Sequence, residues 1–201
     1  MSSSLSPYDV FQKGAVWRPR KRASDSSIFD APAWYACYTH ARAEKRVDGL
    51  LARRGIPSFL PLVSLVRQWH DRRRTVSFPL FPSYVFARFD GAQMGSLLRL
   101  PGVVNIVRFN GRPAAIPDTE IENIARFARG LADSGFVPPP PVEFEPGQKV
   151  TIVSGPFAGV EAVVCELRGH HRVVVGLQSI RIGFEVNVPI ESLKSDNGNK
   201  H

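Results

Sequence analysis

The chain holds few side chains of the types that carry covalent or acid–base catalysis. Cys37 and His40 lie three positions apart, where a thiol and an imidazole could act as nucleophile and base, and His70 and Asp71 are adjacent. A strand-to-helix junction is expected between the first pair, and adjacent residues of a strand point to opposite faces. No glycine-rich phosphate-binding loop or oxyanion-hole segment accompanies these residues. The sequence therefore predicts a protein that is not an enzyme.

The cysteines and histidines form no metal-binding pattern. Cys37 and Cys165 are the only two cysteines, and they fit no CxxC or zinc-ligand spacing. We therefore expect no metal, no cofactor and a reduced, cytoplasmic chain. No apolar run approaches the ~20 residues of a membrane span, and the N-terminal part lacks the apolar core of a signal peptide, so no membrane partner is expected.

The chemistry that the residues favour is binding. The stretch FPLFPSYVFARF, from Phe78 to Phe89, contains four phenylalanines and a tyrosine, and it begins four positions after Arg74, the last of three consecutive arginines. Aromatic side chains contribute much of the energy of protein interfaces, and arginines neutralise phosphates. The formal net charge of +8 and the pI near 10.0 also favour polyanions or acidic protein faces as partners.

Composition divides the chain into two predicted domains. Residues 1–33 combine a serine-rich start with a basic RPRKR cluster and are predicted to be a disordered tail. Four consecutive prolines, from Pro138 to Pro141, predict an extended linker at 132–143. The predicted divisions are the tail, a first domain at 34–131, the linker, a second domain at 144–194 and a polar end at 195–201.

The positive charge belongs to the first predicted domain. Residues 34–131 hold fifteen Lys and Arg against seven Asp and Glu, a net charge of +8. Residues 143–194 hold five against six, a net charge of −1. A nucleic-acid contact is therefore expected before the linker, and a protein contact after it.

Periodicity predicts an α+β fold whose first domain is an α/β sandwich with a mostly antiparallel sheet. The expected elements are a strand at 33–39, a helix ending at Gly55, a hairpin of 59–69 and 75–89 with an arginine-loaded tip, a short helix near 94–98, a strand at 103–109 and a helix beginning at Thr119. Thr119 and Glu122 have the spacing of a capping box.

The second domain is predicted to be a small β-barrel. Its short β-branched runs, at 150–153, 162–167, 172–177 and 184–188, are separated by glycine, proline and histidine. Each interior glycine costs a helix about 1 kcal/mol and each interior proline about 3 kcal/mol, so two long helices are disfavoured here. We expect a permanent barrel that leaves the first domain uncovered.

Motifs across residues 34–194, about 80% of the chain, resemble the NusG family of transcription elongation factors. In order they are Trp34-Tyr35, the FPSYV of 81–85, the LLRLPGVV of 97–104, Arg112-Pro113, the FEPG of 144–147 and the segment from Val150 to Gly159. The QWHDRRR hairpin is most similar to the specialised RfaH and UpxY paralogues. Two positions depart from the family: Ser83, where glycine is usual, and Gln178, near where a hydrophobic residue is usual.

The resemblance implies an antitermination or elongation factor with a NusG N-terminal (NGN) domain and an SH3-like KOW domain. It implies a monomer acting on selected operons, such as those for polysaccharide biosynthesis. The NGN domain would bind the clamp helices of the largest catalytic RNA polymerase subunit and face upstream or non-template DNA. The KOW domain would bind Rho or a small-subunit ribosomal protein. The polymerase-binding candidates are Trp34, Tyr35, Phe81, Pro82, Tyr84 and Phe86.

Several of these assignments have structural alternatives. Because successive side chains of a strand point to opposite faces, Tyr84 and Phe86 are expected on one face and their neighbours on the other. About half of the aromatic residues are therefore expected in the core. The nucleic-acid candidates are Arg72, Arg73, Arg74 and Trp69. The arginines could instead be a solvated hairpin tip, and the tryptophan could pack under its own hairpin instead of stacking on a base.

A ribosome-associated RNA-binding KOW protein is the alternative function. The barrel is the less basic part of this chain, which argues against it.

Overall fold

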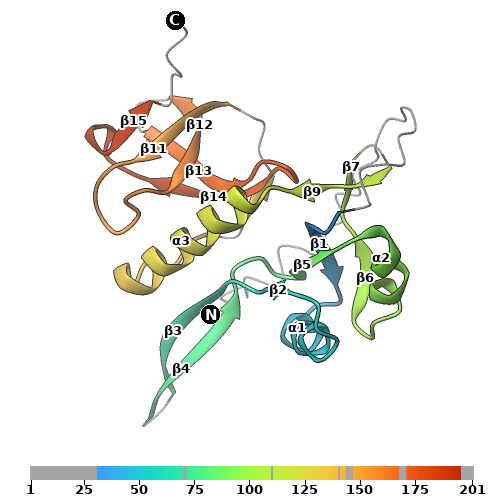
Figure 1. Cartoon of the computed structure of the whole chain (residues 1–201). Coiled ribbons are helices and arrows are strands. Elements are labelled where there is room, and N and C mark those ends of the chain that lie inside the picture. The colour runs from blue at the N-terminus through green and yellow to red at the C-terminus, as the bar shows by residue number, and fades with distance from the viewer. Residues whose placement is uncertain are drawn as a thin grey trace, which may run out of the picture.

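The computed structural model describes residues 31–69, 72–109, 111–139, 141–143, 147–167 and 171–195. The expected polar end beyond Ser195 and most of the expected tail lie outside this part of the chain. The described residues form two larger antiparallel sheets, two separate hairpins and three α-helices (Figure 1).

The first sheet has the strand order β2-β5-β1-β6, with β9 also paired to β1. Its strands are β1 (Ala33–Thr39), β2 (Ser58–Phe59), β5 (Tyr84–Phe89), β6 (Val103–Ile106) and β9 (Ala115–Ile116). β1 and β5 are antiparallel, with Ala36 opposite Phe86. Because side chains alternate along a strand, this register divides the central strands between two apolar clusters.

Two helices cover one face of the first sheet. They are α1 (Glu44–Arg53) and α2 (Gly91–Leu98), and Val47, Leu51 and Leu97 pack with the strand residues of that face. Gly55, at φ 67°, follows the end of α1, as the sequence predicts. α2 begins with a capping box between Asp90 and Gln93. Both helices were predicted from the sequence, and α2 begins three residues before the short helix predicted near 94–98.

α3 (Asp118–Ser134) lies on the opposite face of the sheet. The predicted capping box is wrong, because the helix begins one residue before Thr119 and its N-cap residue is Pro117, whose side chain has no group that could accept a hydrogen bond. The Asp118 carboxylate instead accepts a hydrogen bond from Trp34 and pairs with Arg88. The helix continues to Ser134 and ends at Gly135, at φ 65°.

The predicted hairpin forms, but its second strand is shorter than expected. β3 (Leu62–Trp69) pairs with β4 (Arg72–Pro79), and the hairpin projects from the rest of the chain (Figure 1). The chain then turns, and β5 joins the first sheet instead. At this turn Ser83 has φ 65°, and its N–H donates to Glu44 Oε1 at 2.7 Å. The buried Glu44 carboxylate therefore holds this left-handed backbone at a non-glycine residue, the position where the sequence was expected to depart from the NusG pattern.

The expected strand at 103–109 is also interrupted. After β6, the short strand β7 (Arg108–Phe109) pairs with β8 (Arg112–Pro113) as a small separate hairpin.

The second large sheet, called the C-terminal sheet below, contains the strands predicted from the β-branched runs. Its order is β10-β14-β13-β12-β11-β15. The strands are β10 (Val142–Glu143), β11 (Gln148–Ile152), β12 (Glu161–Leu167), β13 (His171–Leu177), β14 (Ile182–Asn187) and β15 (Leu193–Ser195), with a 3-10 turn, η3, at Ile190–Ser192. Gly176 and Gly183 face each other so closely that a Cβ at Gly176 would lie 2.4 Å from the Gly183 Cα. Side chains would separate these strands.

The C-terminal sheet packs against α3 and the adjacent face of the first sheet (Figure 1). One apolar cluster contains residues of all three, and the rings of Phe81 and Phe184 lie 4.9 Å apart. The expectation of an uncovered first domain is therefore wrong. The glycines and prolines of the C-terminal segment disfavour helices, but they do not determine whether the resulting sheet packs on another surface.

Candidate protein-interaction face and its cover

The predicted polymerase-binding residues lie on both faces of the first sheet. Tyr35 points toward α1 and α2, is 1% exposed, and has its ring 4.6 Å from that of Phe89. Burial raises the pKa of the Tyr35 hydroxyl above its usual value. Pro82 is half-buried in the turn before β5. Tyr35 is therefore part of the helix-side core and does not share a surface with the others.

The other aromatic candidates lie together on the opposite face. We call Trp34, Phe59, Phe81, Tyr84 and Phe86 the aromatic face. The ring of Phe86 lies 5.5 Å from Phe81 and 6.1 Å from Phe59. Tyr84 and Phe86 pack in this cluster while Val85 packs on the helix side, so the predicted alternation is confirmed. Phe59 was missed, although it begins the extended segment predicted at 59–69.

Polar groups surround the more exposed edge of the aromatic face. Trp34 Nε1 donates to Asp118 Oδ1 at 2.8 Å, and Arg88 pairs with the same carboxylate at 3.6 Å. The ring of Tyr84 lies 5.5 Å from that of Tyr38, which is 42% exposed and was not predicted as a site residue. An apolar, aromatic centre with a polar edge is the usual composition of a protein interface.

The C-terminal sheet covers the centre of the aromatic face. Phe81 and Phe184 are each 1% exposed. Phe127 of α3 lies between the two sheets, with its ring 5.2 Å from Phe157 and 5.9 Å from Phe184. The aromatic face is thus closed to solvent at Phe81 and Phe86, and is partly exposed at Trp34 and Tyr84.

Hydrogen bonds from α3 hold the C-terminal sheet in place. Asn123 donates through Nδ2 to the Glu161 carbonyl at 2.8 Å and accepts from the Glu161 N–H at 2.7 Å. Arg126 Nη1 donates to the Gly159 carbonyl at 2.6 Å. Glu120 accepts from both the backbone and the hydroxyl of Ser179, at 3.2 and 2.9 Å. Sequence reasoning missed this contact; its signal was Asn123, a polar residue between the inward Ile121 and Ile124.

Gly130 permits the close approach of α3 to the turn between β11 and β12. A Cβ built on Gly130 of α3 would lie 2.4 Å from the Pro156 carbonyl oxygen and 2.8 Å from Phe157 Cδ1. Real Cβ atoms do not approach other heavy atoms so closely. The packing of the C-terminal sheet on α3 therefore requires glycine at this position.

The predicted nucleic-acid residues lie on the hairpin, where Trp69 is opposite Arg72 in the β3–β4 register. Arg72, Arg73 and Arg74 belong to β4. Their side chains, and that of Trp69, lie outside what the structure describes. The DNA-facing and solvated alternatives both remain predictions.

The candidate catalytic pairs do not form a catalytic site within the described residues. Cys37 is fully buried, and burial raises the pKa of its thiol to about 12, so almost no thiolate is present at neutral pH. His40 is exposed, and His70 and Asp71 lie outside the described residues. No group of His, Cys, Asp and Glu in the described part of the chain could hold a metal ion.

None of the helices in the described residues has the length and apolar character needed to cross a membrane.

Comparison with known proteins agrees with the motif resemblance. Residues 32–125 match the family model described as "Transcription termination factor nusG". A transcription termination/antitermination protein NusG of Streptomyces virginiae is 28% identical over 182 residues, covering 79% of this chain. This alignment spans 60% of the relative's own length.

Two further relatives carry the same name. The Pseudomonas aeruginosa protein is 29% identical and the alignment covers 68% of this chain and 82% of the relative. The Helicobacter pylori protein is 28% identical, and the alignment covers 81% of this chain and 95% of the relative. A solved structure titled "Domain interaction in Thermotoga maritima NusG" is 23% identical, covers 82% of this chain and 97% of that chain, and has a TM-score of 0.43.

The names of these relatives describe transcription termination/antitermination proteins. Residues 32–125 are thus similar to the NusG family model, and between 68% and 79% of the chain aligns with bacterial transcription termination/antitermination proteins.

Proposed function

We propose that this protein is a transcription elongation or antitermination factor that binds RNA polymerase through the aromatic face of its first domain. The observation that carries the proposal is the NusG match over 32–125, the region that contains all five residues of the aromatic face. In this proposal the chain divides into an NGN domain at 34–131, a linker at 132–143 and a KOW domain at 144–194. Residues 132–134 of the predicted linker continue α3, and Val142–Glu143 form β10 of the C-terminal sheet, so the extended part of the linker is shorter than the sequence predicts.

The aromatic face has the composition of a protein-binding site. Phe81 and Phe86 form an apolar centre, and Trp34 and Tyr84 carry polar atoms at its edge. Large aromatic residues at a desolvated centre contribute most of the affinity of protein interfaces. The proposed partner of this face is the pair of clamp helices of the largest catalytic RNA polymerase subunit. Tyr35 is left out of the proposed contact because it belongs to the helix-side core.

Binding through this face requires the C-terminal sheet to move away, because Phe81 contacts Phe184. The apparent affinity of a partner falls in proportion to the fraction of molecules in the binding-competent state. We propose that the covered arrangement holds the factor at low affinity until it is recruited to selected operons, such as those for surface polysaccharide. Release would also free the KOW domain for its own partner, Rho or a small-subunit ribosomal protein.

Nucleic acid is the second proposed partner of the first domain. Its net charge of +8, against −1 in 143–194, favours a polyanion beside the polymerase. Arg72, Arg73 and Arg74 would neutralise phosphates of upstream or non-template DNA, with Trp69 next to them on the paired strand.

Replacing Phe81 and Tyr84 together by alanine is expected to weaken polymerase binding by at least ~2 kcal/mol, about 30-fold in Kd. The measurement is the affinity of the full chain for core RNA polymerase. Because loss of the Phe81–Phe184 contact would also weaken the cover, the comparison is made in a Gly130→Ala background, in which the cover is expected to be displaced. Small-angle X-ray scattering of the background variant checks that displacement first.

Phe109→Ala in the same background is the matched control, since Phe109 is an aromatic residue 39% exposed outside the aromatic face. An equal loss in the control, or unchanged affinity in the double variant with its fold intact by circular dichroism, would place the polymerase contact elsewhere.

A further inference from the structure

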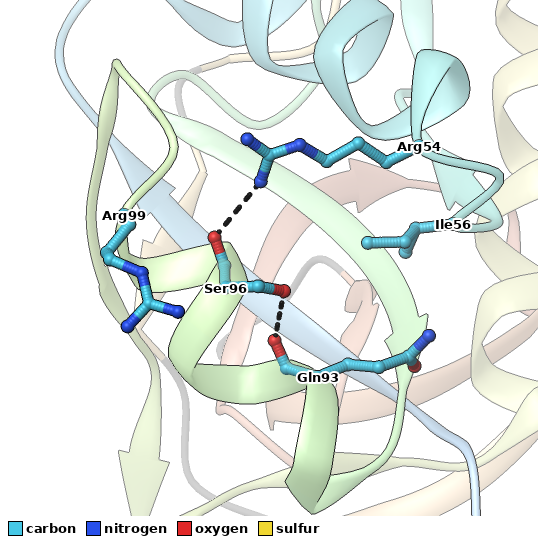
Figure 2. Close-up of a pocket in the computed structure, with 5 residues that line it drawn as sticks. All are labelled: Arg54, Ile56, Gln93, Ser96 and Arg99. Atoms are coloured by element: carbon cyan, nitrogen blue, oxygen red, sulfur yellow. Dashed lines mark hydrogen bonds between the residues drawn. The ribbon is translucent and has the colours of Figure 1, made fainter.

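We infer that a two-arginine pocket between α1 and α2 binds the phosphodiester backbone of DNA. The pocket, of about 380 Å³, is lined by Arg54, Ile56, Gln93, Ser96 and Arg99 (Figure 2). It deepens the nucleic-acid part of the proposed function by naming residues distinct from the hairpin arginines. Buried Ile56 forms its apolar part, and exposed polar side chains surround it.

The two guanidinium groups come from different elements. Arg54 follows the last residue of α1, and Arg99 follows the last residue of α2. Figure 2 shows their side chains on either side of Ser96. Arg54 Nη1 donates to the Ser96 carbonyl at 3.2 Å, and the Ser96 hydroxyl donates to the Gln93 carbonyl at 2.7 Å. Arg54 is therefore held over the pocket with donors left for a ligand, because a guanidinium has five N–H groups.

The charge of the pocket favours an anion. Within the described residues, neither Arg54 nor Arg99 forms an ion pair with a carboxylate. The C-terminal ends of α1 and α2 each contribute about half a negative charge. The two arginine side chains together carry two positive charges, so the pocket keeps a net charge of about +1 after the two helix ends are counted. Arginine also binds phosphate oxygens through two parallel hydrogen bonds.

The shape of the pocket favours a polymer over a small anion. Sites for small molecules enclose most of the ligand, whereas Arg54, Gln93 and Arg99 are all exposed here. A DNA strand can pass across such an open depression and place one phosphate against each of the two guanidinium groups.

The pocket lies on the helix side of the first sheet, and the C-terminal sheet packs on the opposite face. DNA can therefore bind at Arg54 and Arg99 while the aromatic face is still covered. DNA binding therefore does not require the C-terminal sheet to leave the aromatic face, whereas polymerase binding does. The protein can bind DNA before it binds polymerase.

The test is the salt dependence of binding to a labelled duplex of about 20 base pairs, measured by fluorescence anisotropy on the full chain between roughly 50 and 300 mM KCl. Arg99→Ala is expected to reduce the log–log slope by about 0.9 and Arg54→Ala/Arg99→Ala by about 1.8. The Arg99 side chain donates no hydrogen bond to any residue in the described part of the chain, so the single variant should fold normally. The same reductions are expected in a Gly130→Ala background, because the pocket does not depend on the cover.

Arg53→Ala is the matched control, since Arg53 is the exposed neighbour of Arg54 and does not line the pocket. A wild-type slope in the double variant, or an equal reduction in Arg53→Ala, would overturn the inference and leave only diffuse surface charge. Polymerase affinity measured on the same variants separates the two claims. A polymerase-binding chain with an unchanged DNA slope refutes the pocket alone, and a chain that never binds polymerase refutes the proposed function.

Discussion

Gly130→Ala is expected to displace the C-terminal sheet from α3 and to raise the affinity for RNA polymerase by on the order of tenfold, because a larger fraction of molecules is then competent to bind. The added methyl group would lie 2.4 Å from the Pro156 carbonyl oxygen, so the covered arrangement is excluded unless the backbones move apart. Alanine is better than glycine in a helix by about 1 kcal/mol, so α3 itself is not weakened. Small-angle X-ray scattering should show a larger radius of gyration, and polymerase titration should show the gain in affinity.

Gly49→Ala is the control for this experiment. Gly49 lies within α1, and no atom lies within 4 Å of a Cβ built there. This variant should gain a similar helix stability without any change in radius of gyration or polymerase affinity. If Gly130→Ala keeps the wild-type radius and affinity, the cover does not control access to the aromatic face.

Phe127→Ala is expected to lower the free energy of unfolding by about 3–5 kcal/mol, the usual cost of removing a buried phenylalanine. Phe127 is 0% exposed, and its ring contacts Phe184 of β14 and Phe157 of the turn between β11 and β12, within the apolar cluster that α3 shares with both sheets. A cavity at this position therefore weakens both the packing of α3 and the attachment of the C-terminal sheet. Urea denaturation followed by circular dichroism measures the loss.

Phe136→Ala provides the comparison, because Phe136 follows the same helix but is 39% exposed. Phe136→Ala should lower the free energy of unfolding by less than about 1 kcal/mol, because substitutions at exposed positions have small effects. If Phe127→Ala and Phe136→Ala lowered the free energy of unfolding by similar amounts, Phe127 would not be at the centre of the apolar cluster that joins the first sheet, α3 and the C-terminal sheet.

The sequence alone determined the elements whose signals are local. Alternation along β1 and β5 predicted which side chains share a face, and Val85 and Phe86 lie on opposite sides as expected. Gly55 ends α1 through its left-handed backbone conformation. The β-branched runs of the C-terminal segment formed strands because these side chains lose rotamer freedom in helices.

The tertiary structure decided what depends on partners distant in the chain. The turn at Ser83 is held by Glu44, 39 positions away, and it moves β5 from the predicted long strand into another sheet. The cover over Phe81 depends on Phe184, and the contacts of Asn123 with Glu161 depend on a backbone that only the folded sheet presents. A local pattern shows that a side chain is apolar, but two surfaces must fold before their complementarity determines whether that side chain meets a partner or its own C-terminal sheet.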